Sequence, residues 1–478
     1  MNCAIIQGVV MSKRVEKDLL GELSVDDSKY YGVHSQRAIE NFPITGIKTS
    51  IFPIFIQAFA KIKKSSALAN KELGTINPDV ADSIIKACDR LIAGEFSDQF
   101  DIDLIQGGAG TSMNMNVNEV IANIAIESMG GKKGDYSIVN PNDDVNNGQS
   151  TNDTYPSSIK VAVYEYIDVL IAEMYELIAS FEKKAKEYKD VVKVGRTQLQ
   201  DAVPMTMGQG FQNYANQIKS SVAIILESRK ILLGLNMGAT AIGTGITSHP
   251  EYSKIIDKHL KSVISKEFFV MEDLFMGTQD ASGFTYVSGA FKRFAVQLSK
   301  ICNDLRLLSS GPRAGIGEIT LPAKQAGSSI MPGKINPVIP EAVSQVCFQV
   351  VGFDMANAFC AEGGQLELNA FEPLLAYNLL NSILMLSNAI RTLRLNCIDG
   401  IVANVEKCRY NAENNISIVT ALKNHIGYKL CTIIAQRCLE ENKAVFEVTL
   451  ELIKSGKITE IDESKLKEIL DVSKMIKP

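Results

Sequence analysis

The sequence predicts a mainly α-helical protein whose central part is a bundle of long helices. From about Ser157 to Asn396, apolar residues recur at helical spacing. Residues 338–360 and 366–395 are apolar around most of their circumference, so we expect them to be buried on several sides, including between subunits. A four-three spacing, typical of a coiled-coil seam, joins Val287, Phe291, Phe294, Leu298, Ile301, Leu305 and Leu308.

The chain is expected to form three domains. Residues 1–149 form an N-terminal mixed, mostly helical domain, with a loop-rich opening and a helix around 55–73. Residues 150–401 form the central long-helix bundle, in which 159–189 and 218–233 are further long amphipathic helices. Residues 402–478 are more charged, and their Lys/Glu pairs predict short helices of a small C-terminal domain.

Composition excludes several classes of protein. The 478 residues are 46% hydrophobic, enough for a large core. The net charge of −5 argues against a nucleic-acid surface, which normally carries a concentrated basic patch. Nine cysteines without a C-x-x-C pair suggest neither a disulfide framework nor a zinc site. Reduced thiols in the core of a cytoplasmic protein are the simplest interpretation.

The first ten residues are mildly apolar but have no basic region before them, which argues against a signal peptide. We expect Met11 to be the functional start. No stretch approaches the length of a membrane span, so no membrane association is expected.

The segment from Ala326 to Pro337, AGSSIMPGKINP, combines the groups needed to remove a proton from carbon beside a carboxylate. Its glycines predict a mobile loop, and it carries two adjacent serines, a lysine and an asparagine amide. Fixed donors aimed at a developing charge are usually the largest catalytic term. The alternative is a surface turn with an unrelated lysine.

Three other polar segments stand out. The segment from Gly107 brings Thr111 and several amides to the start of a helix, where they would cap the helix or bind an anion. Residues 140–158 are rich in Asn, Asp, Ser and Pro, as in a solvated turn that leads into a helix. Thr197 and Gln198 lie between two helical runs, where a polar helix–helix connection is the alternative to a site.

Four motifs, taken together, resemble the aspartase/fumarase superfamily. They are GSSIMPGKIN, GGAGTSMNMNVNE, NPNDDVNNGQSTND and GRTQLQDAVPMT, and they occur in the family's order. The residues of these motifs are most similar to those of the aspartate ammonia-lyases, and the resemblance extends from about Lys13 to the C-terminus. The resemblance implies a three-domain fold whose subunits form a homotetramer with a shared helical core, and active sites that draw loops from three subunits.

The resemblance also implies the site residues. Ser328 would be the catalytic base, acting after a loop from about Thr320 to Ile335 closes and excludes water. Lys334, the second catalytic residue, would bind the substrate carboxylate together with Asn336. The remaining implied substrate-binding residues are Thr111, Ser150, Thr151, Asn152, Thr197, Gln198 and Ser329.

Two positions depart from the superfamily pattern. Gln198 stands where the superfamily commonly has a histidine acid/base. Glu341 resembles the glutamate that pairs with that histidine, so it has no imidazole partner in this sequence. Losing hydroxide requires a proton donor, whereas an ammonium group can leave as neutral ammonia. Gln198 therefore favours an amine leaving group. Gly210 replaces a usual glutamate, with an effect that we leave open.

The implied activity is the reversible conversion of L-aspartate to fumarate and ammonia in aspartate metabolism, through a stabilised aci-carboxylate. The alternatives are a class II fumarate hydratase, a lyase for another amine, or a non-catalytic scaffold of the same fold. No cofactor is required by this chemistry and no metal ligands are expected, while activation by a divalent cation stays open. The expected partners are small substrates and other copies of this chain.

Overall fold

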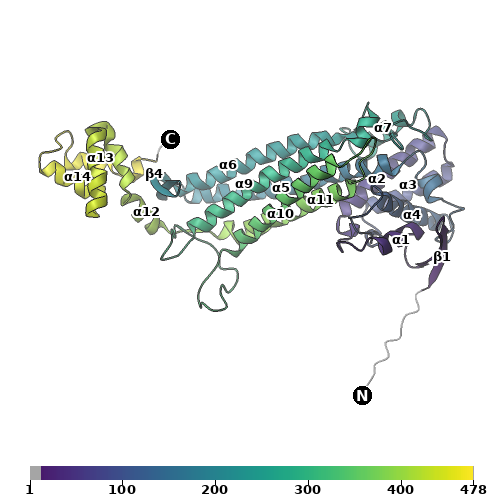
Figure 1. The fold of residues 1–478 in the computed structure, drawn as a ribbon, viewed down its shortest axis with the longest axis horizontal. Helices are drawn as coiled ribbons and strands as arrows, with labels where there is room; N and C mark the ends of the chain where they lie inside the picture. The colour runs from purple at the N-terminus through teal and green to yellow at the C-terminus, as the bar shows by residue number, and fades with distance from the viewer. Residues whose placement is uncertain (1–11, 477–478) are drawn as a thin grey trace, which may run out of the picture. The chain divides into compact units, whose positions relative to one another are not determined.

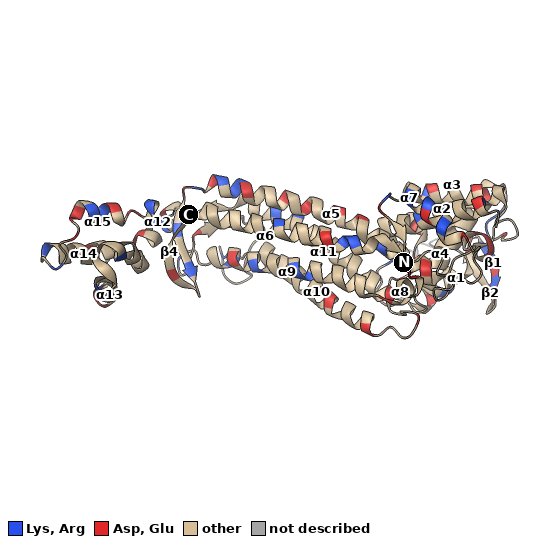
Figure 2. Ribbon diagram, turned by 90° about the horizontal axis from the view of Figure 1, so that it is seen from above, with Lys and Arg blue, Asp and Glu red and all other residues tan. Residues whose placement is uncertain are grey.

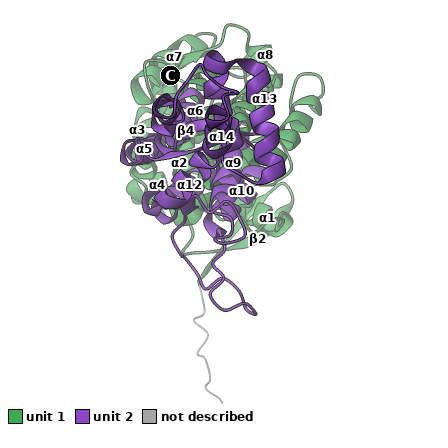
Figure 3. Ribbon diagram, turned by 90° about the vertical axis from the view of Figure 1, so that its left-hand side faces the viewer, with its two compact units in different colours: residues 1–170, 223–293, 349–385 green, residues 171–222, 294–348, 386–478 purple. Residues whose placement is uncertain are grey.

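The computed structural model describes residues 12–476, which divide into two compact units (Figures 1 and 3). Unit 1 contains residues up to 170 with 223–293 and 349–385, and unit 2 contains 171–222, 294–348 and the residues from 386 onward. The expected start at Met11 lies outside the described residues. Five long helices have segments in both units: α5 (Thr151–Glu187), α6 (Met207–Ser228), α9 (Ser282–Leu308), α10 (Val338–Glu362) and α11 (Glu372–Asn396).

Unit 1 combines its helices with a β-hairpin, a short parallel strand pair and helical turns. The other α-helices of the unit are α1 (Val33–Asn41), α2 (Pro53–Leu73), α3 (Pro78–Ile92), α4 (Thr111–Ser128), α7 (Tyr252–Val263) and α8 (Leu274–Gln279). Its strands are the antiparallel pair β1 (Lys13–Asp18) and β2 (Gly21–Asp26) and the parallel pair β5 (Gly234–Leu235) and β6 (Phe269–Val270). Its short helical turns are η1 (Thr49–Ile51), η2 (Ser97–Gln99), η3 (Pro141–Val145) and η4 (Arg229–Leu233).

A polar chain joins the long helices within unit 1. The buried amide of Asn357 on α10 donates to Ser288 on α9 at 2.9 Å and accepts from Asn378 on α11 at 2.9 Å. Buried polar groups without such partners would destabilise the core. The chain therefore fixes the register of the three helices within the apolar core of this unit.

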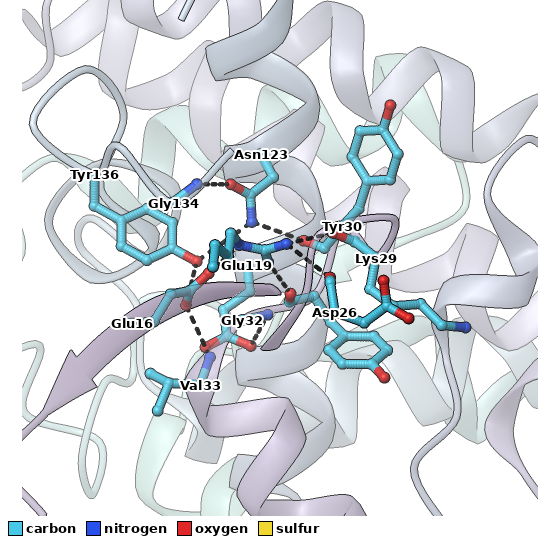
Figure 4. A network of polar contacts seen from close by, with 12 residues as sticks. Glu16, Asp26, Lys29, Tyr30, Gly32, Val33, Glu119, Asn123, Gly134 and Tyr136 are labelled. Carbon is cyan, nitrogen blue, oxygen red and sulfur yellow. Dashed lines mark hydrogen bonds and ion pairs between the residues drawn. The ribbon is translucent and has the colours of Figure 1, made fainter. Parts of the chain in front are cut away.

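A buried carboxylate, Glu119 of α4, binds the N-terminus of α1 (Figure 4). Its oxygens accept hydrogen bonds from the backbone N–H groups of Gly32 (2.8 Å), His34 (2.8 Å) and Ser35 (3.1 Å). These are the donors that a helix start leaves free, and an acidic side chain suits them. Burial raises the pKa of Glu119. The contact fixes α1 against α4, whose first residue is Thr111.

Gly32 is a glycine because there is no room for a side chain. A Cβ there would lie 2.4 Å from the Tyr136 hydroxyl and 2.5 Å from the Glu16 carboxylate. Tyr136 also donates to Glu16 at 3.0 Å, so β1, α1 and α4 meet at this glycine (Figure 4).

Unit 2 carries a β-hairpin and the C-terminal helices. The hairpin consists of β3 (Val192–Thr197) and β4 (Gln200–Thr206), and a second antiparallel pair joins β7 (Ile319–Thr320) to β8 (Val402–Ala403). Tyr214 of α6 donates to Asp304 of α9 at 2.9 Å. The remaining helices are α12 (Val405–Glu413), α13 (Lys423–Glu441), α14 (Val445–Lys454) and α15 (Glu463–Ile469), with the turns η5 (Ile398–Gly400), η6 (Ile416–Leu422) and η7 (Val472–Lys474).

The C-terminal helices share a core to which Val194 of the hairpin also contributes. Acidic and basic positions are mixed along helices such as α5 and α15 (Figure 2), where Lys467 pairs with Glu463 at 2.7 Å. The division into three domains at 149/150 and 401/402 remains a prediction.

The helical expectations are largely confirmed. The seam residues Val287 to Leu305 are buried on α9, and the eight described cysteines are free and buried. The helical region was not continuous as expected, because β3 and β4 interrupt it. The last long helix begins at Glu372 rather than 366, since Pro373 suits a first turn and residues 363–371 form turns.

The expectation that no stretch approaches the length of a membrane span was wrong for one helix. By length and composition alone, the helical stretch Glu372–Gly400 could cross a membrane. Of its most apolar window, 72% is buried inside the protein, as expected of a core helix.

Candidate active site

Ser150, Thr151 and Asn152 form the N-terminal turn of α5 in unit 1. The Ser150 hydroxyl accepts the N–H of Asn152 at 3.2 Å, while the buried Asp153 accepts the N–H of Ser150 at 3.0 Å. The sequence indicated a loop up to residue 158, but the helix begins at Thr151 because these side chains cap it. The triplet therefore lies where free backbone N–H groups and the helix dipole favour an anion.

Pro156 explains how Asn152 is held. A proline within a helix has no N–H, so the carbonyl of the residue four positions earlier, Asn152, is left free. The amide of Asn236 donates to that carbonyl at 3.0 Å, and the Asn152 side chain donates to Ala241 at 2.7 Å. One hydrogen bond from Asn236 and one to Ala241 thus orient this predicted substrate-binding residue.

Thr111 begins α4 and is exposed. The helix was expected to start after the amides of this segment, yet it starts at Thr111 and buries Asn114, Asn116 and Asn118. Asn114 donates to the Thr151 hydroxyl at 3.1 Å, so the first turns of α4 and α5 lie side by side. Gly110 has φ +93°, and a Cβ there would meet the Tyr155 ring at 2.4 Å. Thr111 and the triplet are thus brought together.

Two buried charges lie next to the triplet. Lys63 of α2 donates to Asn146 at 2.8 Å and to Gln149 at 3.0 Å, and burial lowers the pKa of Lys63 to about 7. Burial also raises the pKa of Asp153 to about 6, although it accepts the N–H groups of Ser150 and Thr240. The triplet therefore contacts a buried carboxyl group and is linked through Asn146 and Asn114 to a buried amine.

Thr197 and Gln198 lie at the tip of the β3–β4 hairpin in unit 2, not in the helix–helix connection considered above. Gln198 and Leu199 have φ of +53° and +63°, and all three side chains are exposed. A two-residue turn with positive φ matches the strand twist, but residues other than glycine adopt it at a cost of about 1 kcal/mol each. Strain of this kind is often found at functional sites.

Ser328 lies in the segment between β7 and α10, which contains no helix or strand in residues 321–337. Its hydroxyl oxygen accepts the N–H groups of Ile330 at 3.2 Å and Met331 at 3.0 Å. Hydrogen bonds to the charged form of a group favour that form. These two donors would therefore stabilise an alkoxide at Ser328. Ser329 and Ile330 are exposed beside it.

Lys334 and Asn336 close the same loop. Asn336 donates to the Gly327 carbonyl at 3.0 Å, and a Cβ on Gly327 would lie only 1.5 Å from the Lys334 carbonyl. Only glycine fits at residue 327, so the two ends of the GSSIMPGKIN segment meet there. Lys334 is exposed and forms no salt bridge within residues 12–476. Its charge is available to an anionic ligand.

The predicted site residues thus form two groups. Thr111, Ser150, Thr151 and Asn152 lie in unit 1, and Thr197, Gln198, Ser328, Ser329, Lys334 and Asn336 lie in unit 2. In the described part of the chain, no group of three or more His, Cys, Asp and Glu side chains could hold a metal ion. A Cβ at Gly210 would meet only Met205, at 3.9 Å.

The sequence did not reveal the buried groups that support the site. Lys63 lies in a KIKK run that suggests a solvated face, although it lies one helical turn after the buried Phe59 and two turns after the buried Ile56. Asn146 belongs to a polar segment interpreted as a turn, but its Oδ1 accepts from Lys63, Asn114 and Asn118. Contacts between distant segments create these roles.

Comparison with known proteins identifies the family. The lyase family matches residues 21–352, and the family described as "Fumarase C C-terminus" matches residues 418–477. Because the first match covers more than half of the chain, this chain belongs to the lyase family. The predicted superfamily and its mainly helical fold are confirmed.

Relatives that cover nearly the whole chain include three aspartate ammonia-lyases. The aspartate ammonia-lyase of Helicobacter pylori is 52% identical over 92% of this chain and 94% of its own length. The aspartate ammonia-lyase of Escherichia coli K12 is 49% identical over 97% of this chain and 96% of its own. That of Pseudomonas aeruginosa is 49% identical over 98% of both chains.

Solved structures show the same fold. A fumarate lyase:delta crystallin from Brucella melitensis, bound to cobalt, superposes with a TM-score of 0.93 at 45% identity, covering 98% of this chain and 100% of its own. A class II fumarase from Schistosoma mansoni superposes with a TM-score of 0.90 at 32% identity, covering 97% and 99%.

Proposed function

We propose that this protein is an aspartate ammonia-lyase, which converts L-aspartate reversibly to fumarate and ammonia. The observation that carries the proposal is 49–52% identity to aspartate ammonia-lyases over nearly the whole chain. The enzyme is a carbon–nitrogen lyase. The steps below assign roles to its residues.

Ser328 removes a proton from the β-carbon of aspartate. The two backbone N–H groups on its hydroxyl oxygen support the alkoxide that this step requires. The electron pair of the broken C–H bond moves into the adjacent carboxylate, which becomes an aci-carboxylate dianion. Lys334 and Asn336 bind that carboxylate, and the lysine charge stabilises the dianion more than the substrate.

The aci-carboxylate then collapses to the carbon–carbon double bond of fumarate. The Cα–N bond breaks in this step, and its electron pair leaves with ammonia, which needs no proton donor. Gln198 is consistent with such a leaving group, because an amide can bind an amine but is a poor acid. Thr111, Ser150, Thr151, Asn152, Thr197 and Ser329 bind the other polar groups of the substrate. The two helix N-termini that carry Thr111 and Thr151 favour a carboxylate there.

The loop that contains Ser328 closes over the substrate before the reaction. Ile330 is 82% exposed, and Met331 and Ile335 are also exposed. Apolar side chains at the tip of a loop gain free energy when they are covered, which favours closure on bound substrate.

The active form is a homotetramer with sites shared between subunits. Phe348, Met355 and Phe359 recur on one face of α10 and are each more than 60% exposed. An apolar face of this kind is typical of a subunit interface. The strained, exposed tip at Gln198 would serve a site on another subunit. The enzyme is soluble and cytoplasmic, and it requires no cofactor, although divalent cations could activate it.

Fumarate absorbance tests the activity directly. Purified protein should form fumarate from L-aspartate and not from L-malate. Fumarate from malate alone would favour the class II fumarase alternative. If neither substrate gave fumarate, both the ammonia-lyase and the fumarase assignments would be contradicted. Another amine substrate or a non-catalytic scaffold would then be favoured.

A further inference from the structure

Glu318 is a fully buried carboxylate directly before β7, at the start of the segment that leads to Ser328. Arg196 donates to its Oε1 at 2.7 Å, and Lys193 Nζ lies 3.2 Å from its Oε2. Burial alone would raise the pKa of Glu318, but the hydrogen bond from Arg196 and the charge of Lys193 outweigh burial and lower it. Glu318 therefore remains charged inside unit 2.

Both cations reach this carboxylate from β3, beside an irregular point of the hairpin. Side chains three residues apart on a regular strand point to opposite faces, so Lys193 and Arg196 would diverge. The strand register shifts between Val194 and Arg196, where two residues of β4, Ala202 and Val203, lie opposite Gly195 alone, so the bulge is in β4. A Cβ on Gly195 would lie 2.8 Å from the Val203 carbonyl, so only glycine fits there. Both cations nevertheless contact Glu318, at the point where the regular pairing of β3 with β4 is interrupted.

The charges around Glu318 balance. Asp201, on the paired strand β4, lies 3.7 Å from Arg196 Nε. Two cations therefore face two carboxylates, and Asn411 adds a longer hydrogen bond to Glu318 at 3.4 Å. Breaking a buried pair by removing one partner leaves an uncompensated charge, so Glu318, Lys193 and Arg196 depend on one another, whereas Asp201 is mostly exposed.

The backbone of Glu318 is held as well. Its N–H donates to the Leu308 carbonyl at 2.9 Å, and its own carbonyl accepts the N–H of Asn404 at 2.9 Å. The next two residues, Ile319 and Thr320, pair with β8. After Thr320, residues 321–337 contain no helix or strand. The regular strand pairing of this segment therefore ends at Thr320.

We infer that Glu318 is a positioning residue that holds two segments of the catalytic site on one frame. Through Arg196 it fixes the hairpin whose next residues are Thr197 and Gln198. Through its own backbone it fixes the point from which the Ser328 loop moves. This inference rests on the proposed function, and it places the hinge of the loop at Thr320.

Kinetics of Glu318→Gln and Arg196→Lys test the inference. Glutamine keeps the shape but removes the charge between the two cations, and lysine keeps the charge but loses the planar guanidinium. Because a small misplacement of a catalytic group is costly, we expect kcat for aspartate to fall roughly 10- to 100-fold. The deuterium isotope effect with β-deuterated aspartate should rise, since proton removal becomes slower relative to other steps. A loss of stability alone would lower the active fraction without changing the isotope effect.

Glu173→Gln is the matched control. Glu173 also belongs to unit 2 and accepts from Arg391, but that pair joins α5 to α11 and contacts neither site segment. Its kcat and isotope effect should stay within about twofold of wild type, because the Arg391 side chain of this pair is half exposed and such ion pairs contribute little. Wild-type kinetics in both Glu318→Gln and Arg196→Lys would overturn the inference.

Hydrogen exchange of the wild-type protein supplies a test that needs no variant. Amides 318–320 should be as protected as their partners at 402–404, while amides 321–337 exchange fast. Equal exchange on both sides of Thr320 would overturn the inference. A wild-type protein that forms no fumarate would instead contradict the proposed function, and the exchange result would still decide whether Glu318 is an anchor.

Discussion

The amide of Asn114 donates a hydrogen bond to the hydroxyl of Thr151 at 3.1 Å, and it thereby joins the first turns of α4 and α5. Both helix starts carry residues assigned here to substrate binding. The same amide reaches Asn146, which accepts from the buried Lys63. The relative position of Thr111 and the triplet therefore depends on one buried side chain.

Asn114→Ala should weaken substrate binding. Without the amide, Thr151 and Asn146 lose a donor that holds them, so we expect KM for aspartate to rise roughly tenfold, or about 1.4 kcal/mol. Asn116→Ala is the control, because Asn116 is equally buried on α4 but donates to the Gln99 carbonyl. Steady-state kinetics of both variants measure KM for aspartate and test this expectation. Equal KM values in the two variants would contradict a specific role for Asn114.

Ser328→Ala should remove most turnover and leave assembly unchanged. General-base catalysis typically contributes about 10²- to 10⁴-fold, and alanine cannot accept the proton. Fumarate absorbance gives the rate, and native mass spectrometry with circular dichroism checks assembly and fold. A rate within threefold of wild type would overturn the assignment of Ser328 as base.

Lys334→Ala should raise KM and lower kcat together, because the lysine charge acts on both the bound substrate and the dianion. We expect kcat/KM to fall by at least about 100-fold, as for loss of a strong charge-assisted contact. Lys324→Ala is the control, since Lys324 is exposed in the same loop but lies outside the GSSIMPGKIN segment. If both variants lost activity equally, the effect would come from the charge of the loop and not from Lys334.

Local patterns in the sequence predicted the helices well. The seam on α9 follows from spacing alone, because burial of one helix face is a property of the helix itself. The hairpin at Thr197 was missed for a physical reason. Its turn residues, Gln198 and Leu199, lack the Gly or Asn that normally marks such a turn.

The supporting residues of the site could not be predicted in the same way. Glu318 and Arg196 lie far apart in the sequence, and they meet beside an irregular point of the β3–β4 hairpin. Lys63 is charged, as surface residues usually are, yet its side chain is fully buried because other elements cover that side of α2. Only packing determines whether a charged side chain is exposed or becomes part of a buried network.

The stability of the protein should depend on pH through Lys63. Burial lowers its folded-state pKa to about 7, against 10.5 in the unfolded chain. Between these values the unfolded state binds more protons, so the free energy of unfolding rises with pH. Relative to Lys63→Met, the wild type should gain roughly 2–3 kcal/mol between pH 7 and 9. Urea denaturation at fixed protein concentration measures this difference.

Lys64→Met is the control for that experiment. Lys64 follows Lys63 on α2 but is partly exposed and pairs with Asp89. The difference in unfolding free energy between wild type and Lys64→Met should not grow with pH. A constant difference for Lys63→Met as well would show that the buried amine does not change its protonation in this range.

Assembly should depend on the apolar face of α10. Met355→Glu would place a charge between Phe348 and Phe359, which the proposed interface would bury, so the proposed tetramer should dissociate at micromolar concentration. Light scattering coupled to gel filtration measures the mass, and Leu439→Glu, at an exposed apolar position on α13, is the control. Because the proposed sites use more than one subunit, activity should fall as the tetramer dissociates and recover at higher protein concentration. A fully active Met355→Glu monomer would contradict sites shared between subunits.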